Sequence, residues 1–590
     1  MSPFFTIVVA LCVAIFMTVI GRLLSTHTGE RYYHTTPLHC FIAGLGIWYF
    51  WFLLFTRLGD ISIDTIVYLF TASSMALFFA LPKVFHIKLE MEHFWTLMVA
   101  TLLILSPIFI TLGADEPTFW REFATDIKNA DYLFWFNKIP PRSEVISHGV
   151  LGLENPLAMS VGLTPISYIT QSFNPAVFAC WSFFLLAVTM GGLARSSGID
   201  VKWSNLPIVA AGGLMAIVVL NPFLQTEALF SAYRELWIGA TFFCALMPLF
   251  SKKPLPHGWE VIPTAFVLVF LVGLVPEGIY LAYIVIILWI IRMLIEQSNN
   301  FIAIVFALTV LVTLPLMTFW LWYGNLPYIL LHIDTSLPEV ITSQARYYTV
   351  LISGMIIGSI TAWASLKIVF CGKCSNRILF VEKAWYVLPA TIFIVGIITS
   401  SIFGGHWGVK YMLYSQFILL LPVWVWLRRM YDKMWVHNLA FRSPWAVGFF
   451  LILIVVGAEF SYKNTLSLKQ SYTLDHMKQV SAHIMEQKNK ISGRMVVLDG
   501  YDAPFHADVM GYELRRYAKV SSIDFLEKLD KNSLHKTLKN SGVGYLWVHR
   551  VTEPIERTLS VRLERGYSYL FTVGEFDFRL VTIYPHPSYQ

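Results

Sequence analysis

Residues 112–127, "LGADEPTFWREFATDI", place two adjacent carboxylates, Asp115 and Glu116, directly after a long apolar run. Pro117 suits the first turn of a helix, and apolar residues follow it at intervals of four, which predicts an amphipathic helix. A helix of this kind lies in the membrane interface. It would hold both carboxylates at the depth where an amphiphilic substrate presents its polar head group. The alternative, that they are solvated groups at the end of a membrane span, stays open on position alone.

Several other polar side chains are expected at the same side of the membrane. Ionisable residues at membrane depth are costly and usually face a cavity, although snorkelling relaxes this cost at the end of a span. Each residue taken alone also fits a structural role, but their convergence on one side favours a site. The candidates are His148, Arg234, Glu235, Glu277, His406, Lys410 and Tyr411.

The composition requires many membrane-spanning helices to position these groups. Of the 590 residues, 56% are hydrophobic and 14% are charged, whereas soluble domains are about 45–50% apolar and about 25% charged. Apolar runs long enough to cross a bilayer recur along the chain, and we count about fourteen. They cover approximately 4–21, 38–56, 63–81, 94–112, 176–194, 205–220, 236–250, 260–275, 279–295, 300–320, 347–369, 384–402, 411–427 and 444–461.

The basic residues assign a side to each loop. Loops at one side carry most of the lysine and arginine, which is typical of the cytoplasmic side. The cytoplasmic set is Arg22, Arg31, Lys83, Lys88, Arg195, Lys202, Lys252, Lys253, Arg292, Lys373, Arg377, Lys383, Arg428, Arg429, Lys433 and Arg442. The opposite short loops contain only Arg57, Arg234, Arg346 and Lys410. This pattern predicts that the large loop 113–175 and everything after residue 462 face outward.

The tail after residue 462 has a soluble composition. "RMVVLDG" and "VGYLWVHR" predict strands, "SSIDFLEKLDKNSLHKTLKNSG" predicts an amphipathic helix, and "YSYLFTVGEFDFRLVTIY" predicts a closing hairpin. We therefore expect a polytopic α-helical membrane protein with a small C-terminal extracytoplasmic α/β domain. The expected domains are an N-terminal bundle over 1–93, a transmembrane core over 94–461, and the outer domain over 462–590.

Other function classes find little support in the sequence. The net charge of +6 is spread over short loops and predicts no nucleic-acid partner. The six cysteines lie in or beside apolar segments, which argues against a disulfide framework. The pair Cys371 and Cys374 forms a single CxxC, which is a weak signal for a metal or redox site. No nucleotide-phosphate loop of the GxxxxGK[ST] type occurs.

Four segments together resemble bacterial glycosyltransferases of the GT-C superfamily, in particular the dolichyl-phosphate-mannose-protein mannosyltransferase-like branch. "GADEPTFWREFATDI" resembles the opening of the family's first outer loop, and "SHGVLGLENPLAM" resembles the return of that loop to the membrane. "NPFLQTEALFSAYRELWIGA" and "GGHWGVKYML" resemble two later elements, in the family's order. Lys410 stands where this branch usually has arginine, and Ala114 and Glu154 also depart from the pattern.

The resemblance implies a GT-C-like core and transfer of a sugar from a polyprenyl-phosphate carrier to an acceptor on a glycan, lipid or protein. Asp115 would be the general base toward the acceptor hydroxyl, with Glu116 orienting the acceptor. The leaving phosphate needs cationic stabilisation, for which Lys410, His406 and Arg234 are candidates. His148, Glu235 and Tyr411 complete the expected substrate-binding set. The expected location is the cytoplasmic (inner) membrane of a cell envelope, with the site facing the periplasm.

No cofactor is expected with certainty, and a divalent cation stays open. Two other readings also remain. An O-antigen ligase or polymerase usually has its large loop late in the chain, whereas here it comes early. A transporter or flippase of lipid-linked glycans would predict broken helices and inverted repeats, which are not clear in the sequence.

Overall fold

The computed structural model divides the chain into two compact units, each of which is described by itself. One contains Met1–Asp115, Asn137–Arg142 and Asn155–Leu468, and the other contains Glu116–Phe136, Ser143–Glu154 and Lys469–Gln590. The structure describes residues 3–26, 36–85, 130, 133–134, 137–139, 157–171, 176–196, 234–250, 255, 261–296, 301–323, 352, 355–356, 358–365, 385, 387–403, 411–422, 425, 494–498, 518–521, 543–549, 568–573 and 576–582.

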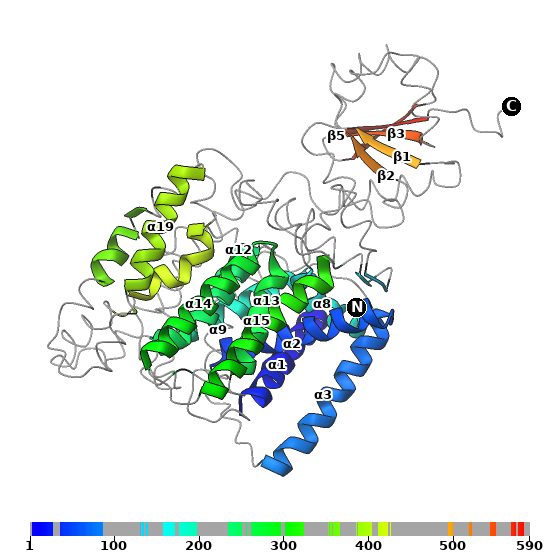
Figure 1. Ribbon diagram of the computed structural model, residues 1–590. Helices are drawn as coiled ribbons and strands as arrows, with labels where there is room; N and C mark the ends of the chain where they lie inside the picture. Colours follow the sequence, from blue (N-terminus) through cyan, green and yellow to red (C-terminus); the bar gives the residue numbers. More distant parts are fainter. Residues whose placement is uncertain are drawn as a thin grey trace, which may run out of the picture. The chain divides into compact units, whose positions relative to one another are not determined.

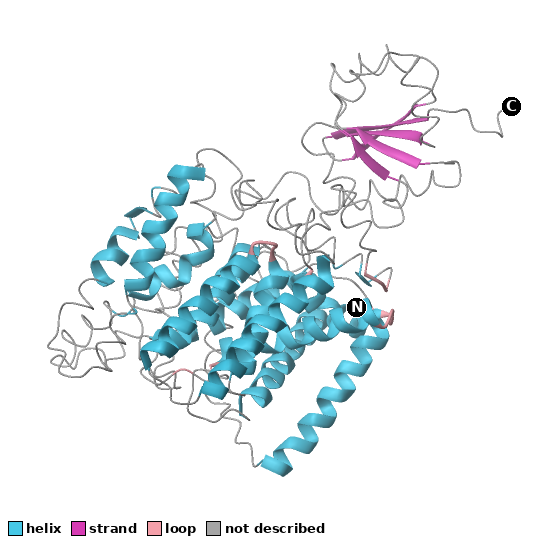
Figure 2. Ribbon diagram, viewed as in Figure 1, coloured by secondary structure: helices cyan, strands magenta, loops and turns pink. Residues whose placement is uncertain are grey.

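Helices make up the described part of the first unit (Figures 1 and 2). They are α1 (Pro3–Thr26), α2 (Pro37–Leu58), α3 (Ile63–Phe85), α8 (Ala158–Thr170), α9 (Ala176–Ser196), α12 (Arg234–Leu246), α13 (Ile262–Leu274), α14 (Gly278–Glu296), α15 (Phe301–Tyr323) and α19 (Val387–Phe403). The 3-10 helix η4 (Met247–Phe250) extends α12, and a further apolar helix covers Tyr411–Pro422.

Three of the described helices are long and apolar enough to cross a membrane, namely Pro37–Leu58, Gly278–Ile295 and Ile302–Trp322. Each lies on a predicted span. The predicted spans 94–112, 205–220 and 444–461 lie outside the described residues. The total of fourteen spans therefore stays a prediction.

Helix α2 packs closely on both α1 and α13, because one of its glycines faces each of these helices. A Cβ atom at Gly44 would overlap the carbonyl oxygen of Met17 in α1, and one at Gly46 would overlap that of Phe266 in α13. Small residues at such positions allow the backbones of membrane helices to pack in contact. Thus α1 and α2, which the sequence assigned to an added N-terminal bundle, pack directly on the predicted core. The boundary near residue 93 itself lies outside the described residues.

Helix α8 differs from expectation, since it lies within the segment predicted to be an outer loop. All its residues except Ile169 are buried. Trp48 Nε1 of α2 donates to the carbonyl oxygen of Val161 at 2.7 Å, and Gly162 lies beside Trp181 of α9. The loop 113–175 therefore does not run outside the helical unit over its whole length. The apolar stretch from Leu157 to Ile166, which is too short to span a bilayer, accounts for the difference.

Arg292 also differs from expectation. The charge pattern placed it in a cytoplasmic loop, but it lies within α14 and is only 3% exposed. Its Nη1 donates to the carbonyl oxygens of Pro248, at 2.9 Å, and Leu249. Carbonyls at a helix end lack helical partners, so they can satisfy a buried guanidinium.

The second unit contains a five-stranded mixed sheet with strand order β2-β1-β3-β5-β4. Its strands are β1 (Arg494–Leu498), β2 (Ala518–Ser521), β3 (Val543–His549), β4 (Ser568–Val573) and β5 (Phe576–Thr582). Strands β2, β1 and β3 are parallel, whereas β5 is antiparallel to both β3 and β4. The predicted strands and closing hairpin match β1, β3, β4 and β5; the sequence did not predict β2. The helix predicted between β2 and β3 lies outside the described residues.

Candidate functional site

Arg234 and Glu235 form the start of α12 and are buried, with exposed fractions of 4% and 5%. A carboxylate in the first turn of a helix interacts favourably with the positive end of the helix dipole. The burial of two charged residues within an apolar unit is costly and is typical of a functional or strongly coupled position. The structure thus places both predicted site residues inside the helical unit, not at its solvated surface.

Tyr411, a third predicted site residue, begins the helix Tyr411–Pro422 and is partly buried. This helix packs against the start of α12. Gln416 Nε2 donates to the backbone carbonyl oxygen of Glu235 at 3.3 Å, although 181 positions separate the two residues. A Cβ atom at Gly239 would lie 3.3 Å from the carbonyl oxygen of Leu413. The segments "NPFLQTEALFSAYRELWIGA" and "GGHWGVKYML", which contain Gly239 and Leu413, are therefore in contact in the fold.

The aromatic rings strengthen this contact. Phe243 of α12 and Phe417 lie with their ring centroids 6.4 Å apart, within the range of favourable aromatic pairs. Farther along, Thr361 Oγ1 donates to the carbonyl oxygen of Leu419 at 2.6 Å. The helix Tyr411–Pro422 therefore has contacts both with α12 and with Thr361.

Glu277 forms part of a tight turn between α13 and α14 and is 7% exposed. Its carbonyl oxygen accepts from the backbone N–H groups of Tyr280, at 3.0 Å, and Leu281, at 3.3 Å. The turn itself is closed by the N–H group of Gly278, which donates to the carbonyl oxygen of Val275 at 2.9 Å. The turn matches the prediction from "GLVPEGIYL", but the glutamate is buried.

A second polar cluster, formed by Asp64, Asn137 and Tyr168, was not predicted. Asp64 opens α3, Tyr168 lies near the end of α8, and Asn137 comes from the predicted outer loop. Tyr168 OH donates to Asn137 Oδ1 at 2.9 Å, and Ile63 N–H donates to the Asn137 carbonyl at 3.2 Å. Asn137 has a φ of 54°, a left-handed conformation that asparagine tolerates better than most residues. The asparagine directly before Lys138, after an aromatic run, is a weak sequence signal for such a turn.

Arg57, which the sequence assigned to the outer side, lies near the end of α2. Its guanidinium carbon is 5.2 Å from the ring centroid of Trp322 at the end of α15. A cation over an indole face is a favourable contact, worth more when it is shielded from water. The contact shows that the ends of α2 and α15 lie together.

The remaining predicted site residues, Asp115, Glu116, His148, His406 and Lys410, lie outside the described residues. Cys371 and Cys374 do so as well. Within the described part of the chain, no group of three or more His, Cys, Asp or Glu side chains could hold a metal ion.

Comparison with models of known protein families found no match for the chain, and comparison with curated proteins also found none. The interpretation of the site therefore depends on its residues and their arrangement.

Proposed function

We propose that this chain is a polyprenyl-phosphate-dependent glycosyltransferase of the cytoplasmic membrane. It moves a sugar from the lipid carrier to a hydroxyl group of a glycan, lipid or protein on the periplasmic side. The proposal includes about fourteen spans, a GT-C-like core and an outward-facing α/β domain at the C-terminus.

The observation that carries the proposal is the contact between α12 and the helix Tyr411–Pro422. The Gln416–Glu235 hydrogen bond joins two segments that contribute five of the eight expected site residues. A lipid phosphate needs cations at the point where charge grows on the leaving oxygen, and Arg234 and Lys410 belong to these two segments. The contact between α12 and the helix Tyr411–Pro422 supports a shared role of Arg234 and Lys410 toward a single anionic group.

Transfer requires the acceptor hydroxyl to lose a proton as it attacks the anomeric carbon. Asp115 is the proposed base for that proton, and Glu116 the residue that orients the acceptor. The bond from the anomeric carbon to the carrier oxygen breaks, and the carrier leaves as a phosphate monoester. Because that group is already acidic, electrostatic stabilisation serves it better than protonation.

The direct test is an incubation of the purified full-length chain with a panel of polyprenyl-phosphate sugars and envelope acceptors. We expect carrier-dependent transfer of at least one sugar, followed as label moving from the lipid to the acceptor. Asp115→Asn serves as the matched control, because it preserves shape and removes the basic oxygen. Transfer from a lipid-linked oligosaccharide but not from a monosaccharide carrier would instead favour a ligase or polymerase.

A further inference from the structure

Arg22 of α1 is a buried cation, and one of its guanidinium nitrogens has no acceptor among the residues that the structure describes. Its side chain is 9% exposed, and its Nη1 atom is enclosed without a hydrogen-bond partner. A buried guanidinium nitrogen that lacks an acceptor costs free energy, and a charged group costs more than a neutral one. A bound anion at this position would therefore be favourable, because it would accept a hydrogen bond from Arg22 Nη1 and balance its charge.

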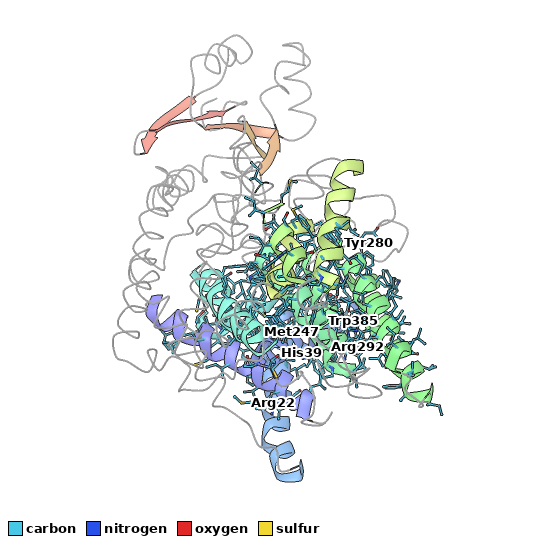
Figure 3. All side chains as sticks on the ribbon, turned by 90° about the vertical axis from the view of Figure 1, so that its left-hand side faces the viewer. Arg22, His39, Met247, Tyr280, Arg292 and Trp385 are labelled. Carbon is cyan, nitrogen blue, oxygen red and sulfur yellow. The ribbon has the colours of Figure 1, made fainter. Side chains whose placement is uncertain are left out.

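The packing of α1 on α2 places Arg22 beside the start of α2. A Cβ atom at Gly44 would meet Met17, and one at Gly21 would meet Cys40, so the two helices run antiparallel. Because Gly21 lies opposite Cys40, the next residue of α1, Arg22, lies at the same height as His39 in the first turn of α2. Figure 3 shows Arg22 and His39 toward the same end of the helical unit, whereas Tyr280 lies toward the other end.

The first turn of α2 adds to the positive potential at this level. A helix N-terminus carries a partial positive charge and favours anions. Thr36 caps the helix by accepting from His39 N–H at 3.3 Å, and the first turn contains no acidic residue. The guanidinium and the helix end therefore favour the same kind of ligand.

Arg292 provides a contrast, because its Nη1 donates to two backbone carbonyls, whereas Nη1 of Arg22 is enclosed without an acceptor among the described residues. Arg22 also follows directly on the predicted span 4–21, at the depth where lipid phosphates are the abundant anions.

We propose that Arg22 and the N-terminus of α2 bind a phosphate group, supplied by an anionic membrane lipid. The guanidinium suits a phosphate because its planar donors can form two parallel charge-assisted hydrogen bonds. The proposal rests on the membrane placement of α1 and not on the transferase activity, so either one can fail alone.

The test measures lipid binding to the full-length chain in detergent, with phosphatidylglycerol, phosphatidylcholine and inorganic phosphate as separate probes. We expect the wild type to prefer phosphatidylglycerol. Arg22→Gln should weaken that binding about tenfold or more, the factor expected when a hydrogen bond to a charged group is lost. Arg22→Lys should retain part of the preference, because it keeps the charge but not the planar fork.

Arg57→Gln is the matched control, since it removes a cation at the other end of α2 and should leave the preference intact. Arg22-dependent binding of inorganic phosphate at similar concentrations would identify a free phosphate as the ligand source. Unchanged phosphatidylglycerol binding in the Arg22→Gln variant would overturn the proposal. A second outcome would also overturn the proposal. If Arg22→Gln and Glu30→Gln lose the same thermal stability and neither changes lipid binding, the anion that pairs with Arg22 is the chain's own Glu30.

Discussion

Asn137 and Asp64 bind each other through two hydrogen bonds, although 73 positions separate them. Asn137 Oδ1 accepts from Asp64 N–H at 2.9 Å, and Asn137 Nδ2 donates to Asp64 Oδ1 at 2.9 Å. Because Tyr168 also donates to Asn137, this one side chain joins α3, α8 and a segment of the large loop. The segment is therefore fixed where it passes the start of α3.

We predict that Asn137→Ala destabilises the helical unit by about 1–3 kcal/mol, because it leaves partly buried donors and acceptors without partners. Thermal unfolding of the purified chain in detergent measures the change. Tyr168→Phe removes only one of the hydrogen bonds and should cost about 1 kcal/mol. An unchanged melting temperature for Asn137→Ala would show that the cluster contributes nothing to stability.

A second prediction concerns the contact of α1 with α2. Gly44→Val should cost roughly 1–3 kcal/mol or prevent folding, because the added atoms overlap the Met17 carbonyl. Gly162→Ala is the control, since its Cβ would lie 3.3 Å from Trp181 Cζ3, at a contact that small shifts can relieve. Yield of monodisperse protein and melting temperature report the outcome. Equal behaviour of the two variants would contradict the close packing.

The proposed base gives a third prediction. Asp115→Asn should lower the rate of transfer by a factor of about 10²–10⁴, the usual contribution of a general base. Its melting temperature should stay near that of the wild type, since the substitution keeps the shape of the side chain. Single-turnover rates with the active carrier measure the effect. Wild-type rates in this variant would remove Asp115 from the mechanism.

Lys410 gives a fourth prediction. If its ammonium contacts the carrier phosphate, Lys410→Gln should weaken donor binding and slow the chemical step together, since both states carry negative charge there. Lys410→Arg should be tolerated, because a guanidinium also binds phosphate. Initial rates against carrier concentration separate kcat from KM for both variants. A lysine that only snorkels would leave both parameters of the Gln variant within about twofold of wild type.

The orientation of the chain is a fifth prediction. In a cysteine-free background, Asp131→Cys and Asn540→Cys should both react with a membrane-impermeant thiol reagent in intact spheroplasts. The reason is that the distribution of lysine and arginine places both segments outside. A cysteine in the 373–383 loop provides the negative control. Protection of both outer positions until the cells are lysed would reverse the topology and exclude the proposed periplasmic site.

Local sequence patterns were enough to predict the apolar, helical character of the chain and the bounds of most described helices. Apolar length and turn residues act locally, which explains why α2, α13, α14 and α15 begin and end near their predicted limits. The strands of the tail were predictable for the same reason, since β1 and β3 are short runs rich in apolar residues and β5 begins by alternating apolar and polar residues. The short strand β2 was missed because four residues carry little periodic signal.

Which segments contact one another, in contrast, followed from the folded structure and not from any local pattern. The contact of Gln416 with Glu235 and that of Asn137 with Asp64 join residues far apart in the chain, and no local pattern encodes such pairs. Burial was equally inaccessible to sequence reasoning. Arg292 and Glu277 have the charge of loop residues, yet the packing of neighbouring helices and the presence of nearby carbonyls or turns decide whether such a side chain reaches water. This difference arises because apolar length specifies a helix, whereas the complementarity of helix surfaces specifies its neighbours.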